Sequence, residues 1–211
     1  MFRSSRKSPR VRLAAIAVGA GLLTAVGLTA TAGPASADTV LNVHYDLTGT
    51  AFINKANTTV NLGAGTLSSA VDLNNGALIS TLSLPPGTIS FRTSKGLLVT
   101  VTTAIIQNSP ASGAINLNTG TITSTANVTL KVTHVTAAGS SVQVGSNCKT
   151  SPFNIDITSG KGFSIITGGP LEGTFTIPSF GDCEFGTQLL NINISGPGNT
   201  LNLALGGVQL G

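Results

Sequence analysis

The residues that could support acid–base or nucleophilic chemistry are few and scattered. The two histidines are His44 and His134, and one tight carboxylate pair, Asp182 and Glu184, flanks Cys183. A nucleophilic hydrolase needs a serine or cysteine beside a base, and no G-x-S-x-G elbow occurs. The carboxylate pair could serve a glycosidase, but solvated loop charges beside the cysteine are the preferred interpretation, because a chain with no Trp and one Tyr has few rings for sugar stacking. We therefore predict no catalytic residue and a non-enzymatic protein.

Metal and cofactor sites are not predicted either. The run DLNNG at residues 72–76 resembles the start of an EF-hand loop, but the bidentate acid of such a loop would fall on Ser83. The run SGKG at residues 159–162 lacks the Ser or Thr that follows Gly-Lys in a phosphate loop. Neither Cys148 nor Cys183 has a second Cys or His at ligand spacing.

The first 37 residues have the three parts of a secretory signal peptide. A basic segment holds five Lys or Arg residues, residues 13–28 are apolar, and Ala35-Ser36-Ala37 forms an A-x-A site before Asp38. We predict cleavage between Ala37 and Asp38, which divides the chain into a signal peptide (1–37) and a secreted domain (38–211). We expect this domain to be extracellular or associated with the cell envelope, with no transmembrane segment in the mature chain.

Signal removal changes the charge balance of the chain. The whole sequence carries +4, whereas residues 38–211 hold six Lys and Arg against seven Asp and Glu, a net charge of −1. The six cations are scattered along the sequence, so no basic patch is predicted. Nucleic acid and anionic membranes are therefore not expected as partners.

Cys148 and Cys183 are the only cysteines. In an exported protein an even pair predicts a disulfide. The loop that it closes would stabilise the fold by roughly 3 to 4 kcal/mol in the chain-entropy model, so we expect a structural bond.

Alternation of apolar and polar residues, the pattern of half-buried strands, recurs after residue 37. It is clearest over residues 41–47 and 128–133, and appears again in short runs at Phe153, Ile155 and Ile157, at Phe175 and Ile177, at Leu190, Ile192 and Ile194, and at Leu201, Leu203 and Leu205. Gly, Pro and Asn turn signals separate the runs, and no helical stripe is evident. We predict an all-β fold, an antiparallel β-sandwich or barrel in a single domain.

The same alternation places both histidines. His44 shares parity with Asn42 and Asp46 and should face outward. His134 shares parity with Val132 and should lie at the edge of the core.

Two segments resemble each other at an offset of 44 residues. VDLNNGALIST at residues 71–81 aligns with INLNTGTITST at residues 115–125. Each predicts a strand, a turn and a strand. Thr119 is β-branched and disfavours positive φ, so we expect a type I turn with Gly120 in the left-handed region and a G1 bulge. We expect Gly76 to adopt the same conformation in the first segment. The two copies predict paired hairpins at comparable places in one sheet system.

Several short motifs resemble a group of β-rich secreted proteins of actinobacteria. They are the Leu-Asn-x-Gly turns, LSLPP at residues 82–86, VGSNCKT at 144–150, GTFTIP at 173–178 and SGPGNT at 195–200. The resemblance covers most of the mature chain. It implies export and a disulfide-bearing β-domain, and it carries over no catalytic residue.

Two functions follow from these observations. The first is a non-enzymatic extracellular or cell-envelope β-domain with a structural or interaction role. Its neutral Thr-rich strand faces and sheet edges would contact envelope components or a second copy. The alternative is a carrier that holds an apolar small molecule inside a barrel or sandwich. The carrier hypothesis is supported by the apolar runs at residues 96–99 and 104–106. A strand buried on both faces would also explain these runs.

Overall fold

The computed structural model describes residues 39–211, which form fourteen strands and one short helix. The elements are β1 (Val40–Ile53), β2 (Thr58–Asn61), β3 (Gly65–Asp72), β4 (Ala77–Ser83), β5 (Gly87–Arg92), β6 (Leu98–Gln107), β7 (Ala111–Ile115), β8 (Ile122–Ala137), β9 (Ser140–Val142), β10 (Lys149–Thr150), β11 (Phe153–Ser159), β12 (Gly169–Ile177), β13 (Phe180–Gly181), α1 (Gly186–Asn193) and β14 (Gly196–Leu210). The predicted signal peptide and its cleavage site between Ala37 and Asp38 lie outside the described residues.

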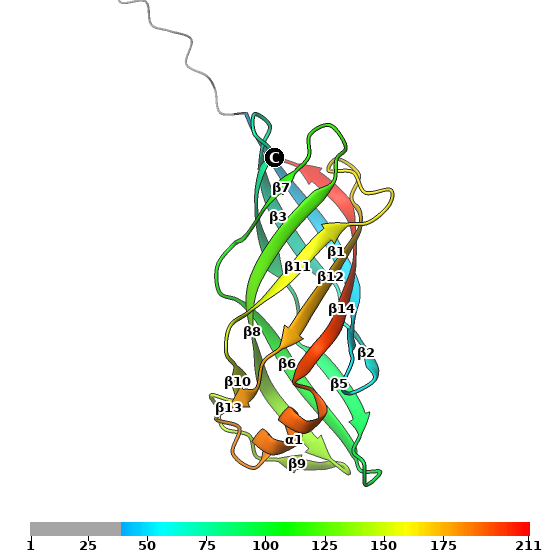
Figure 1. Ribbon diagram of the computed structural model, residues 1–211, viewed down its shortest axis with the longest axis vertical. Helices are drawn as coiled ribbons and strands as arrows, with labels where there is room; N and C mark the ends of the chain where they lie inside the picture. The colour runs from blue at the N-terminus through cyan, green and yellow to red at the C-terminus, as the bar shows by residue number, and fades with distance from the viewer. Residues whose placement is uncertain (1–38) are drawn as a thin grey trace, which may run out of the picture. The chain divides into compact units, whose positions relative to one another are not determined.

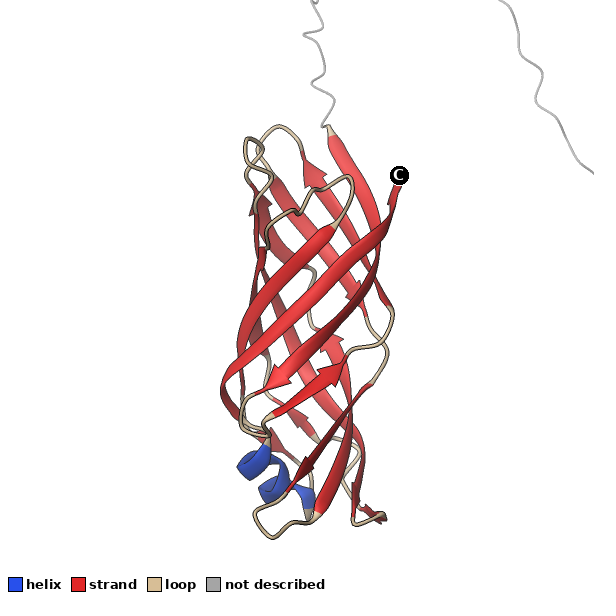
Figure 2. Ribbon diagram, turned by 90° about the vertical axis from the view of Figure 1, so that its right-hand side faces the viewer, coloured by secondary structure: helices blue, strands red, loops and turns tan. Residues whose placement is uncertain are grey.

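Eight of these strands close into an antiparallel barrel (Figure 1; Figure 2). Their order is β11-β12-β14-β1-β3-β4-β7-β8, and β8 pairs back onto β11 from Phe153 opposite Val128 to Thr158 opposite Thr123. The all-β prediction is confirmed. Of the two architectures that the alternation allowed, the structure has the barrel.

The longest strand, β8, serves two parts of the sheet. Its first half pairs with β7 and β11 in the closed barrel. Its second half pairs with β6 on one side and with β9 and β10 on the other, and β5 extends the sheet beyond β6. These strands reach the end of the barrel where α1 lies (Figure 1).

The two segments that resemble each other in sequence form neighbouring hairpins. One is β3 and β4, the other is β7 and β8, and β4 pairs with β7. Val71 and Leu78 at the base of the first turn pack with their counterparts Ile115 and Ile122 in one apolar cluster. The hairpins are therefore paired in space as well as in sequence.

Both turn glycines have positive φ, +76° at Gly76 and +73° at Gly120. The loop differs from the expected G1 bulge, however. The Gly120 amide donates to the Asn116 carbonyl oxygen (2.7 Å), the Asn116 amide donates to Thr121 (2.8 Å), and Ile115 still opposes Ile122. A four-residue loop thus closes the hairpin without an extra residue in the ladder. The side chains of Asp72 and Asn116 each accept the amide two residues ahead, which holds both loops in the same shape.

Alternation predicts the two faces of β1 correctly. Val43, Tyr45 and Leu47 are buried in the barrel, whereas His44 and Asp46 are exposed. A strand that closes a barrel must point every second side chain inward, so this pattern follows from the pleat.

One predicted strand is wrong. Leu190, Ile192 and Ile194 belong to α1 and its C-terminal cap rather than to a strand. Leu190 and Ile194 are four residues apart and fully buried, while Ile192 is 58% exposed. An i, i+4 pair on one face of a helix explains these burials, and three alternating residues are too few to distinguish it from a strand.

The predicted position of His134 is also wrong, because a bulge in β8 changes the parity. Thr102 opposes His134 and Thr103 opposes Val132, which leaves Thr133 as an extra residue. Thr133 and His134 are both exposed, and Val135 returns to the core. An inserted residue reverses the faces of everything beyond it, so parity counted from Val132 fails here.

Candidate functional site

Side chains fill the interior of the barrel almost completely. Two internal cavities of about 50 Å³ each remain, one under the end of the barrel that holds both hairpin turns and one nearer the middle. An engineered cavity that binds benzene is roughly 150 Å³. Neither space is large enough for a lipid chain as the structure stands.

The loop of residues 160–168, between β11 and β12, covers the cavity beneath the hairpin turns. Its Phe163 and Ile165 pack onto the apolar core, and both line this cavity. Tyr45 donates its phenolic hydrogen to the Ile165 carbonyl oxygen (2.6 Å), and burial raises the pKa of Tyr45 to about 12. The loop is therefore tied to the barrel by an apolar plug and one hydrogen bond.

Polar side chains form a continuous outer surface over four neighbouring strands. We call this surface the polar wall; it consists of the outward-facing residues Thr123, Thr125, Asn127, Asn154, Asp156, Thr158, Glu172, Thr174, Thr176, Thr200 and Asn202 of β8, β11, β12 and β14. Strand register aligns them in rows. Thr125, Asp156, Thr174 and Thr200 form one row, and Thr123, Thr158, Glu172 and Asn202 form the next.

Hydrogen bonds between side chains order one edge of the polar wall. Thr129 donates to Asn108, the Asn108 amide to Asn127 and the Asn127 amide to Asn154, at 3.2, 2.9 and 2.8 Å. Thr125 donates to Asp156 Oδ1 (3.0 Å). These bonds hold Asn154 and Asp156 in place before any ligand arrives, which lowers the entropic cost of binding.

Three adjoining depressions hollow the polar wall, and Asp156 lines all of them. Their volumes are about 450, 350 and 390 Å³. Thr174 and Thr200 line the first and second, and Thr158 lines the second and third. We call the three together the trough, and the first, which lies against Phe153 and Phe175, the cleft.

The cleft opens where β11 and β12 part. Their ladder ends at Ile155 opposite Phe175, so Phe153 has no partner on β12. Phe153 and Phe175 stack there with ring centroids 6.1 Å apart, and both also line the more central internal cavity. These two core side chains therefore lie between the cleft and the barrel interior, and Phe153 is only 8% exposed.

The charge of the trough is negative. Asp156 and Glu172 line it from the paired strands β11 and β12, where each lies two residues from the other's direct partner, and no lysine or arginine lines it. Unpaired carboxylates favour neutral or cationic ligands and repel anionic ones.

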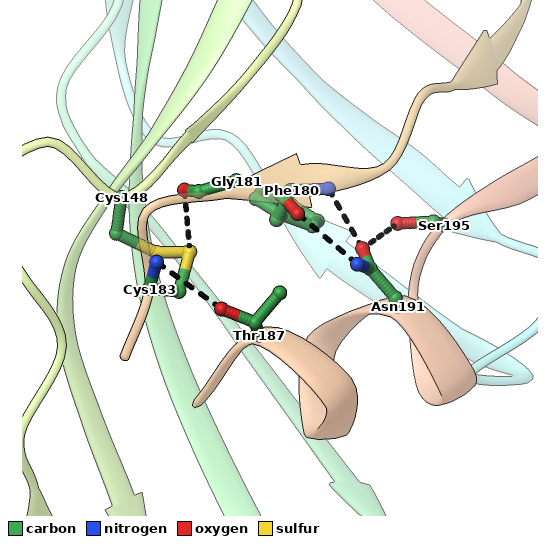
Figure 3. The surroundings of a disulfide bond; sticks show 7 residues. All are labelled: Cys148, Phe180, Gly181, Cys183, Thr187, Asn191 and Ser195. Carbon is green, nitrogen blue, oxygen red and sulfur yellow. Dashed lines mark hydrogen bonds between the residues drawn. A yellow bond between two sulfur atoms is a disulfide. The ribbon is translucent and has the colours of Figure 1, made fainter. Parts of the chain in front are cut away.

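The predicted disulfide joins Cys148 to Cys183, at the end of the barrel near α1 (Figure 3). Both cysteines are completely buried. Asn191 of α1 accepts the Phe180 amide (2.7 Å) and donates to the Phe180 carbonyl oxygen (3.0 Å). These contacts fix the helix to the disulfide-bonded segment and give this region a structural role.

The residues with catalytic potential do not come together. His44 shares a hydrogen bond with Ser68 on the neighbouring strand (2.9 Å), and His134 lies exposed on β8. Asp182 and Glu184 are exposed on either side of Cys183, both with positive φ. Within residues 39–211, neither histidine hydrogen-bonds to a carboxylate, and no group of three or more potential metal ligands is found.

The sequence predicts neutral Thr-rich strand faces, but it does not locate the polar wall. Alternation at Phe153, Ile155 and Ile157 indicates that Asn154 and Asp156 face outward. It does not show that these residues lie beside Thr125, Thr174 and Thr200, because that depends on long-range register.

Comparisons with protein-family models, curated proteins and solved structures found no match to this chain. The resemblance to secreted actinobacterial proteins therefore stays a prediction. No helix within residues 39–211 has the length and apolar character needed to span a membrane.

Proposed function

We propose that this protein is a non-enzymatic β-barrel of the extracellular space or cell envelope, and that it acts by contact through its polar wall. The observation that carries the proposal is a contrast between the two sides of the barrel. The interior leaves two cavities of about 50 Å³, whereas the outer wall presents a trough of ordered polar side chains. The depressions of the trough are shallow and open to solvent, which suits a partner that lies along the surface of the barrel.

Contact through sheet edges has less support. Closure of the barrel removes the free edges of its eight strands. The strands off the barrel path include β2, β9 and β13, which are four, three and two residues long. These three edges are short templates for pairing with a second copy, and β5, six residues long and paired only with β6, is the longest such edge.

Binding to isolated cell envelope tests the proposal. We expect the secreted protein to sediment with washed envelope fragments of the cells that produce it. Thr174→Arg, which places a long cation in the trough, should reduce the sedimented fraction. Thr81→Arg is the matched control, because Thr81 is an exposed, outward-facing threonine on β4. A protein that stays in the supernatant, or equal loss in both variants, would contradict the proposal.

A second candidate function is that of a carrier for an apolar molecule. The cavity under residues 160–168 favours it, because apolar side chains and a few polar ones line that cavity, including the hydrogen-bonded hydroxyls of Ser69 and Ser80. Carriage of a lipid would need Phe163 and Ile165 to leave the barrel. Extraction and mass spectrometry of the secreted protein distinguish the two functions.

A further inference from the structure

We propose that the trough binds a neutral or cationic glycan strand. The inference rests on the proposed function and names the partner of the same surface. It follows from the hydrogen-bonding chemistry of the polar wall, from the extent of the trough and from its charge, with a small apolar contact in the cleft.

The hydrogen-bonding groups of the trough match those of a sugar. Sugar hydroxyls both donate and accept hydrogen bonds. The trough offers carboxylate acceptors at Asp156 and Glu172, an amide at Asn154, and hydroxyls at Thr174 and Thr200. Such a mixed set can satisfy hydroxyls that point in several directions.

The cleft supplies an apolar surface at one end of the trough. Phe153 and Phe175 line it from the side of the core, with polar Asn154 and Thr176 beside them. Sugar rings present C–H groups on one face and hydroxyls around the rim. Phe153 is only 8% exposed and Phe175 is partly buried, so the two rings add a small apolar contact for the C–H face of a sugar, and the polar groups of the trough supply most of the recognition.

The extent of the trough favours a polymer over a single sugar. Its depressions reach from β7 across β8, β11 and β12 to β14, and neighbouring strands lie 4.7–4.9 Å apart, so its width is roughly 19 Å. Shared residues make the depressions continuous: Asp156 lines all three. A ligand of several linked rings would fill more of this surface than one ring could.

The charge of the trough selects among glycans. Asp156 and Glu172 are its charged residues, and no cation lines it to neutralise them. Uronic-acid or phosphate-bearing polymers would be repelled, whereas neutral sugars and amino sugars would not. The outward side chains are also short and mostly neutral, unlike the aromatic and Arg anchors of protein interfaces.

Titration with soluble oligosaccharides tests this inference. The secreted protein, labelled with ¹⁵N, is titrated with hexamers of N-acetylglucosamine, glucosamine and galacturonate, which are neutral, cationic and anionic. We expect backbone amide shifts confined to the polar wall with the first two probes, tighter binding of glucosamine, and no shifts with galacturonate. Asp156→Asn should reduce the preference for glucosamine by roughly two- to fivefold, the range for one exposed ion pair. Asp46→Asn removes an exposed carboxylate on β1, outside the trough, and should leave that preference unchanged.

Two results would overturn the glycan assignment. One is the absence of wall shifts with both amino-sugar hexamers, and the other is binding of galacturonate as strong as that of glucosamine. If either occurred while the protein still sedimented with envelope through Thr174, the proposed function would stand and a protein partner would replace the glycan. Loss of sedimentation itself would instead contradict the proposed function.

Discussion

Gly76 lies directly against Ile115 of the neighbouring hairpin. The Ile115 amide donates to the Gly76 carbonyl oxygen (2.8 Å), and a Cβ on Gly76 would collide with the Ile115 carbonyl oxygen. Gly120, with nearly the same positive φ, has open space where its Cβ would be. The two turns share a conformation and differ in their surroundings.

This difference predicts unequal costs for the same substitution. Gly120→Ala should lower the free energy of unfolding by about 1 kcal/mol, from backbone strain alone. Gly76→Ala should cost about 2–4 kcal/mol, because the collision adds to the strain. Urea denaturation of both variants measures the difference. Equal costs would show that the contact with Ile115 relaxes freely.

The disulfide should contribute strongly to stability. Cys148 and Cys183 are 35 residues apart in sequence, and a loop of this size corresponds to roughly 3–4 kcal/mol in the chain-entropy model. Non-reducing peptide mapping should find the bridge in the secreted protein. The Cys148→Ala, Cys183→Ala double variant should unfold at a lower denaturant concentration than the original protein. Two free thiols in the exported protein would contradict the assignment.

The raised pKa of Tyr45 predicts that the fold loses stability at high pH. Its folded pKa of about 12 lies above the ordinary value of 10.0, so the unfolded chain loses the proton first. The free energy of unfolding is unaffected by ionisation of this tyrosine below pH 10. It falls as the pH rises from 10 to 12, at up to about 1.4 kcal/mol per pH unit.

Spectrophotometric titration can follow Tyr45 alone, because the chain has one tyrosine and no tryptophan. Tyr45→Phe is the control for the titration of lysines, and it should show a shallower decline of stability over the same pH range. An unshifted tyrosine titration would contradict burial of the hydroxyl.

The barrel interior should be free of ligand. With cavities of about 50 Å³, the secreted protein should carry no stoichiometric lipid, and added fatty acids should leave its Tm unchanged. Extraction with mass spectrometry and thermal melts are the measurements. One copurifying apolar molecule per chain, or a saturable rise in Tm, would favour the carrier.

Export should leave a mature N-terminus at Asp38. The prediction depends on the basic segment, the apolar stretch and the A-x-A site at residues 35–37. Intact-mass measurement of secreted material gives the N-terminus directly. A retained precursor, or a terminus far from Asp38, would be inconsistent with the predicted signal.

Local patterns predicted much of the fold. Alternation along residues 41–47 identifies both faces of β1, since the pleat itself sets that period. The cysteine pair predicted the bridge that the structure contains. The resemblance between residues 71–81 and 115–125 predicted two hairpins, and they are neighbours through β4 and β7.

Local patterns failed where a single residue changes the geometry. The bulge at Thr133 moves His134 out of the core. The neighbouring residue types give no signal that a bulge occurs there. Leu190 and Ile194 fit a strand by spacing, yet they are buried by a helix that Asn191 ties to Phe180. In both places contacts with distant segments outweigh the short pattern.

The amino-acid order was sufficient for strand type, for the faces of most strands and for the disulfide, because these depend on neighbours along the chain. It was not sufficient for the closure of the barrel or for the polar wall. Thr125, Asp156, Thr174 and Thr200 come from four strands and meet only because β8 pairs with β11, β11 with β12 and β12 with β14. Register between such strands is set by the packing of all the inward-facing side chains together, so it emerges only when the barrel is complete.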